Sequence, residues 1–194
     1  MRRKSFDAVA SAAGLVLAAV LLAASGLLFW AHGFTDNNVR AQLTEQNIFM
    51  PKAGSDQLND PLVKPYLSKY AGQQVVTGEQ AKAFADHYIK VHLNEATGGR
   101  SYSELSTASR LDPTNTELQG LVQTSFRGET LRGLLLNAYA FGKMGEIALV
   151  GAWIALGTGT TLLLLAAAGL VHMRRTEYDV EVHVPGWHPE KAHA

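Results

Sequence analysis

The chain has 194 residues, with 17 basic and 17 acidic side chains and no cysteine. The balanced charge excludes a nucleic-acid-binding surface, and the lack of cysteine excludes disulfide frameworks, thiol nucleophiles and cysteine-ligated zinc or iron–sulfur sites. Apolar residues gather in two long blocks around a polar middle, which predicts a mainly α protein with two transmembrane helices flanking an extracytoplasmic helical domain.

The first apolar block follows a short N-terminal segment, residues 1–7, and predicts a transmembrane helix over residues 8–32. The 24 residues from Ala8 to Ala31 carry no charge, and about 20 are enough to cross a hydrocarbon core. A cleavable signal peptide is the alternative, because Ala23-Ala24-Ser25 fits a small-x-small cleavage site. Since the apolar run continues through Trp30, we expect an uncleaved anchor.

The middle of the chain, residues 33–146, predicts an extracytoplasmic helical domain of about 110 residues, large enough for its own core. We expect the first helix to continue to Gln46. Pro51, Pro61 and Pro65 then predict turns and short helical pieces in place of one long helix.

A capped helix is predicted over residues 77–99. Thr77 and Gln80 have the spacing of a capping box, and Gly98-Gly99 is a typical helix stop. One face of this helix is expected to be buried, and it comprises Ala81, Phe84, Ala85, Tyr88 and His92.

Two more helices complete the predicted domain. Ser101 and Glu104 form a second capping box, which opens a short helix ending near Arg110. The last helix is expected to begin at Asp112 or Thr114 and to lead into the second apolar block. Its apolar side comprises Leu118, Leu121, Val122, Phe126, Leu131, Leu134 and Leu135.

The second block predicts a transmembrane helix over residues 147–173 and a cytoplasmic tail over residues 174–194. Basic residues flank both blocks on their outer ends: Arg2, Arg3 and Lys4 precede the first, and Arg174 and Arg175 follow the second. By the positive-inside rule, we expect a plasma-membrane protein with both termini in the cytoplasm. Valines alternate in the tail, for which we expect disorder or pairing with a partner.

Small residues recur along both blocks at spacings that allow close helix approach. We expect the two spans to pack together or against another subunit through them. They are Gly14, Ala18, Ala19 and Ala23 in the first block and Gly151, Ala155 and Gly159 in the second.

His87, His92 and Glu95 are the candidate metal ligands, because two imidazoles and a carboxylate suit mononuclear iron or zinc. Their spacing opposes a shared site, since five α-helical residues turn His92 by about 140 degrees from His87. The other interpretation is a structural histidine, His92, satisfied by Glu95 or Tyr88. No metal or cofactor is therefore predicted.

Five charged residues near the second block are candidate interface residues. Glu129 and Arg132, and Lys143 and Glu146, are each one helical turn apart and can pair. Arg127 is placed to contact a lipid phosphate or the carboxylate of a partner, or to anchor the helix at headgroup depth.

Three segments resemble a family of small actinobacterial two-span membrane proteins. They are MRRKSFDAVASAAGLVLAAVLLAASGLLFWAHGF, VTGEQAKAFADHYIKVHL and FRGETLRGLLLNAYAFGKMGEIALVGAW, and the resemblance covers nearly the whole chain. Members often carry the label of an aromatic ring-opening dioxygenase of the small-subunit type. The resemblance thus implies ring cleavage at an iron held by two histidines and a carboxylate.

Three functions are carried forward from the sequence. The first is a non-catalytic assembly or accessory subunit, whose partners are the lipid bilayer and another membrane protein or a second copy of the chain. The second is an extracytoplasmic ligand sensor, because a domain between two spans is the layout that couples binding to a helix shift. The third is the dioxygenase that the resemblance implies.

Overall fold

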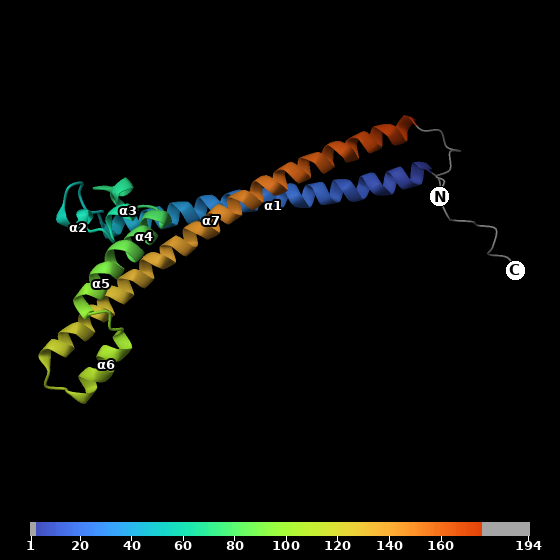
Figure 1. The fold of residues 1–194 in the computed structure, drawn as a ribbon. Coiled ribbons are helices and arrows are strands. Elements are labelled where there is room, and N and C mark those ends of the chain that lie inside the picture. The colour runs from blue at the N-terminus through green and yellow to red at the C-terminus, as the bar shows by residue number, and fades with distance from the viewer. Residues whose placement is uncertain (1–2, 176–194) are drawn as a thin grey trace. The chain divides into compact units, whose positions relative to one another are not determined.

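The computed structural model describes residues 3–175, so the predicted tail lies outside the described residues from position 176 onward. The described part is helical, with no strand, which confirms the mainly α fold class (Figure 1). The chain divides into two compact units. Among the described residues, unit 1 holds those up to Phe29 and those from Leu149 onward, and unit 2 is Trp30–Ala148.

Two long helices run through both units: α1 (Arg3–Gln46) and α7 (Thr116–Arg175). Each contains a stretch long and apolar enough to cross a membrane. The predicted continuation of the first helix to Gln46 is confirmed.

Within unit 1, small side chains hold α1 and α7 close together. Ala18 and Ala152 are fully buried, and a Cβ added at Gly14 would lie 3.4 Å from the Cβ of Ala166. The hydroxyl of Ser25 donates a 2.9 Å hydrogen bond to the carbonyl oxygen of Ala152. The expectation that the two apolar stretches pack against each other is confirmed for α1 and α7.

Large apolar side chains of unit 1 lie on the outside of this helix pair. Val16 is 64% exposed, Trp153 61% and Leu164 66%. Only 11% of the most apolar window of α1 and 17% of that of α7 is buried. Unit 1 therefore has small residues inside and large apolar residues outside, the reverse of a helical pair in water.

Unit 2 continues from α1 into short helical pieces, as the prolines predict. They are α2 (Asp56–Asn59), α3 (Lys64–Leu67) and the 3-10 turn η1 (Ser68–Tyr70). An isolated antiparallel bridge between Phe49 and Gln74 closes this segment.

The predicted helix over 77–99 is present, but it is divided by a π-helical turn. Its parts are α4 (Gly78–Phe84), the π turn η2 (Ala85–Ile89) and α5 (Lys90–Thr97). Both signals at its ends are confirmed, because Thr77 and Gln80 form the capping box and Gly98 adopts the left-handed conformation, with φ of 62°.

The second capping box is also confirmed, and it opens α6 (Tyr102–Leu111). The start predicted for the last helix was wrong. Its N-cap is Asn115, whose side-chain oxygen accepts a 3.0 Å hydrogen bond from the Leu118 amide. Asp112 instead accepts from the side chains of Thr114 and Asn115 in the preceding turn.

The core of unit 2 brings α1, the short pieces, α4 with its π turn, and α7 together. Of the face predicted to be buried, Ala81 and Ala85 are fully buried, whereas the rings of Phe84 and Tyr88 pack against the core from its edge. From the apolar side of α7, Leu135 enters this core. The buried core residues are Val39, Leu43, Met50, Leu58, Val63, Leu67, Val75, Ala81, Ala85 and Leu135.

Candidate functional site

The capped helix lies against α7 at a point where glycine is required. A Cβ added at Gly78 would lie 3.0 Å from the Cα of Tyr139 and 3.2 Å from the carbonyl oxygen of Ala138. Gly142 faces the same contact, since its added Cβ would lie 3.6 Å from the Cα of Gly78. The first turn of α4 therefore approaches the backbone of α7 directly.

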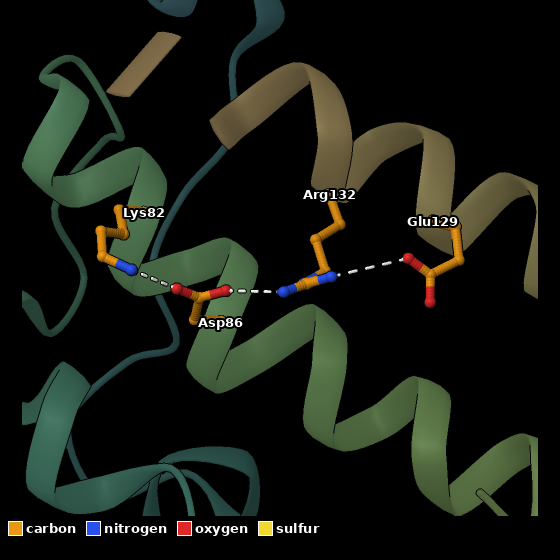
Figure 2. Close-up of polar contacts among 4 residues, drawn as sticks. All are labelled: Lys82, Asp86, Glu129 and Arg132. Carbon is orange, nitrogen blue, oxygen red and sulfur yellow. Dashed lines mark hydrogen bonds and ion pairs between the residues drawn. The ribbon is translucent and has the colours of Figure 1, made fainter. Parts of the chain in front are cut away.

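An ion-pair network then joins the π turn to α7 (Figure 2). One oxygen of Asp86 pairs with the Lys82 ammonium, and the other accepts a 3.0 Å hydrogen bond from Nη2 of Arg132. Nη1 of Arg132 lies 3.6 Å from a carboxylate oxygen of Glu129. The predicted pair of Glu129 and Arg132 is confirmed, and Asp86 is the member that sequence reasoning missed.

The charged groups in this network stabilise one another in their ionised forms. Partial burial raises the pKa of Asp86, but the hydrogen bonds from Lys82 and Arg132 outweigh it, so the pKa of this carboxyl lies below its usual value. The hydrogen bond to Asp86 likewise raises the pKa of Lys82. The Asp86 side chain is 20% exposed and that of Arg132 26% exposed, so this contact is partly shielded from water.

The histidines of the capped helix are engaged separately. The ring of His87 stacks on Tyr66, with ring centroids 3.6 Å apart and planes within 5°, and burial lowers the pKa of His87. Nδ1 of His92 lies 2.9 Å from the carbonyl oxygen of Tyr88, and its ring packs on the Tyr88 ring. His92 thus contacts Tyr88, one of the two partners expected in its structural interpretation, while Glu95 is exposed.

These residues do not fit an iron centre of the kind that the family resemblance implies. Within residues 3–175, no three histidine, aspartate or glutamate side chains are placed to hold one metal ion. His87 itself lies in the π turn and His92 in α5, so the angle expected from regular α-helical geometry does not apply to them. Even so, the His87 ring stacks on Tyr66 and the tilted His92 ring packs on Tyr88, while Glu95 is exposed.

A second network lies at the start of α4. Nζ of Lys143 lies 2.7 Å from a carboxylate oxygen of Glu146 and 2.7 Å from one of Glu79. The hydrogen bonds to Glu146 and Glu79 raise the pKa of Lys143. The predicted pair of Lys143 and Glu146 is confirmed, and Glu79 adds a bridge to α4 that the sequence did not predict.

Arg127 is exposed on α7 and takes no part in either network. Its position leaves the guanidinium accessible to solvent or to a partner, so its predicted interface role stays a prediction.

Unit 2 also contains a groove of about 410 Å³, lined by α1 and α7. Its α1 side includes Phe34, Asn38 and Gln42, and its α7 side includes Leu134 and Phe141. No charged side chain lines it. A volume of this size lies within the range of small-molecule sites, roughly 300–1,000 Å³, which are mostly apolar with a few polar groups.

Comparisons of the chain with protein-family models, with curated proteins and with solved structures give no match. Function is therefore argued from the geometry of the two units.

Proposed function

We propose that the protein is an integral membrane protein that serves as a non-catalytic assembly or accessory subunit. The observation that carries this proposal is the reversed pattern of unit 1, in which small residues meet between the helices and large apolar residues point outward. In water, such an exposed apolar surface would have to be covered by further protein contacts. In a membrane, the hydrocarbon chains of the lipids contact it directly.

The proposed membrane is the plasma membrane, with both termini in the cytoplasm and unit 2 on the opposite side. Support comes from the basic residues that flank the apolar stretches, Arg2, Arg3 and Lys4 at one end and Arg174 and Arg175 at the other. Trp30 is 67% exposed at the end of the first stretch, a position that suits an aromatic residue at the membrane–water interface.

The proposed assembly role rests on the surfaces that remain open. Outward side chains such as Val16, Trp153 and Leu164 leave unit 1 able to contact lipid or another helix. The exposed Arg127 of unit 2 supplies a cation for a partner carboxylate.

Two measurements on native membranes test this proposal. Alkaline carbonate washing should leave the full chain in the membrane pellet, and release into the supernatant would refute membrane integration. Cross-linking in mild detergent should recover a complex of defined stoichiometry, with a second copy or another membrane protein. A chain recovered only as a monomer, without cross-linked partners, would refute the assembly role.

An extracytoplasmic sensor is the second candidate, and the groove in unit 2 is the observation that favours it. A ligand bound there would contact α1 and α7, the two helices that also contain the apolar stretches. Cysteines placed in the two apolar stretches would report a ligand-induced shift as a change in disulfide yield. An unchanged yield across a panel of small molecules would count against a sensor.

A further inference from the structure

The groove of unit 2 combines apolar walls with a row of uncharged amides. Phe34 is 57% exposed on α1, and Leu134 and Phe141 are 55% and 57% exposed on α7. Asn38 and Gln42 lie on the α1 wall one turn apart, and Asn137 lies on the α7 wall. Such a surface offers both a place for an apolar chain and hydrogen-bonding groups for a neutral head.

We propose that this groove binds the apolar chain of a neutral amphiphile from the membrane, with the amides holding its uncharged polar head. This inference rests on the proposed membrane location. The ligand class is a single-chain lipid whose head carries hydroxyl, ester or amide groups and no formal charge.

The side-chain amides that line the groove have donors and acceptors that are not used in hydrogen bonds within the described part of the protein. Nε2 of Gln42 donates a 2.6 Å hydrogen bond to Oδ1 of Asn38, which leaves the Asn38 amide protons and the Gln42 carbonyl oxygen to face other groups. Asn137 adds a third amide from α7. Together they can donate to and accept from a hydroxyl or ester head.

The lining also argues against a charged head. Neither wall supplies a cation or an anion, and bringing a charge against apolar surface without a partner is costly. Phosphate and carboxylate heads are therefore disfavoured in the groove.

Phe34 places part of the groove near the expected headgroup level of the membrane. Phe34 is both a groove residue and a stacking partner of Trp30, with ring centroids 5.6 Å apart. Trp30 ends the apolar run of the first predicted span, and tryptophan at such positions lies at headgroup level. An amphiphile at that level would therefore lie near Phe34, which lines the groove.

A second copy of the chain fits the groove less well. In a two-fold symmetric contact centred on the groove, the same concave surface would meet itself, and the two grooves would enclose a larger volume than one. Unfilled apolar volume is destabilising, and a chain-shaped ligand fills it without that penalty.

The test uses a matched pair of bulky substitutions at neighbouring asparagines. Asn38 lines the groove, whereas Asn37 is exposed outside it. Asn38→Trp should fill the groove, and Asn37→Trp should leave it open with the same change in composition. Asn137→Trp fills the groove from α7 and serves if Asn38→Trp does not fold, as judged by circular dichroism.

The probe is a monoacylglycerol with a photoactivatable diazirine at the end of its acyl chain. It is added to the full-length protein in mild detergent, and labelled residues are mapped by mass spectrometry. We expect labelling at groove residues that falls about tenfold or more with Asn38→Trp, because the filled groove loses its apolar contact area, and that persists with Asn37→Trp.

Three outcomes would overturn the inference. One is labelling confined to the outer faces of unit 1. Another is labelling of groove residues that is the same in Asn38→Trp and Asn37→Trp as in the unchanged protein. The third comes from the protein cross-linking in mild detergent proposed above, and it is a protein, a second copy included, joined to groove residues. Carbonate washing of the same variants separates this failure from that of the proposed function, because a chain that stays in the membrane but does not take the probe refutes only the groove inference.

Discussion

Replacing Asp86 by asparagine tests whether the network in Figure 2 holds the capped helix on α7. The change keeps the shape of the side chain but removes the charge that Lys82 and Arg132 share. Because Arg132 is only 26% exposed and its Nε is buried without a hydrogen-bond partner, the loss of Asp86 deprives this guanidinium of its shielded anion.

The magnitude follows from the exposure of each contact. The Lys82 side chain is 41% exposed, so its pair with Asp86 contributes about 0–1 kcal/mol. The partly shielded hydrogen bond from Arg132 contributes about 1.5–3 kcal/mol, and asparagine retains some of it. We expect the free energy of local opening to fall by about 1–2 kcal/mol, which corresponds to about tenfold faster amide exchange.

The assay is hydrogen-exchange mass spectrometry on residues 78–97 of the full chain in detergent at pH 7. Glu129→Gln is the control, because it removes only the 3.6 Å contact to Arg132 from a carboxylate that is 52% exposed. Equal exchange in Asp86→Asn and Glu129→Gln would refute the central role of Asp86. Additive effects of Asp86→Asn and Arg132→Met on exchange in a double-mutant cycle would refute it as well.

Three further predictions follow from single contacts. Gly78→Ala should destabilise the contact of α4 with α7 by about 1–3 kcal/mol, whereas Gly133→Ala, with nothing within 4 Å, should stabilise α7 by roughly 0.5–1 kcal/mol; equal thermal shifts would contradict this. Gly159→Leu should lower the melting temperature in detergent, since an added Cβ there would lie 3.1 Å from Leu22, and Gly157→Leu should not; a drop in both would argue against a specific contact between α1 and α7 at Gly159. Because burial lowers the pKa of His87, the unfolded state takes up its proton first, so stability should fall as pH drops from about 6.5 through the folded pKa; the fall should be smaller in His87→Gln, and an unchanged pH profile would refute the assignment.

Local signals in the sequence predicted much of the secondary structure. The capping boxes at Thr77 and Ser101 depend on residues three apart, and the pair of Lys143 and Glu146 depends on one helical turn. Such contacts are determined within a few residues, so their spacing is visible in the chain. The N-cap of α7, Asn115, was not predicted because Asp112, Thr114 and Asn115 are all good N-cap residues.

The tertiary contacts of the site could not be predicted in the same way. Asp86 and Arg132 are 46 positions apart, and nothing in either local pattern identifies the other as its partner. The π turn carries Asp86, and a helical pattern alone does not indicate an inserted residue. The contact between Gly78 and Tyr139 likewise depends on how α4 lies on α7.

The most direct test of the proposed membrane arrangement uses single cysteines, because the chain has none of its own. Ser103 and Ser5 are both exposed, one in α6 of unit 2 and the other before the first apolar stretch. In intact cells, a membrane-impermeant maleimide should label Ser103→Cys and should reach Ser5→Cys only after the membrane is permeabilised. Labelling of both positions in intact cells, or of neither, would contradict a protein that crosses the plasma membrane with its N-terminus in the cytoplasm and unit 2 outside.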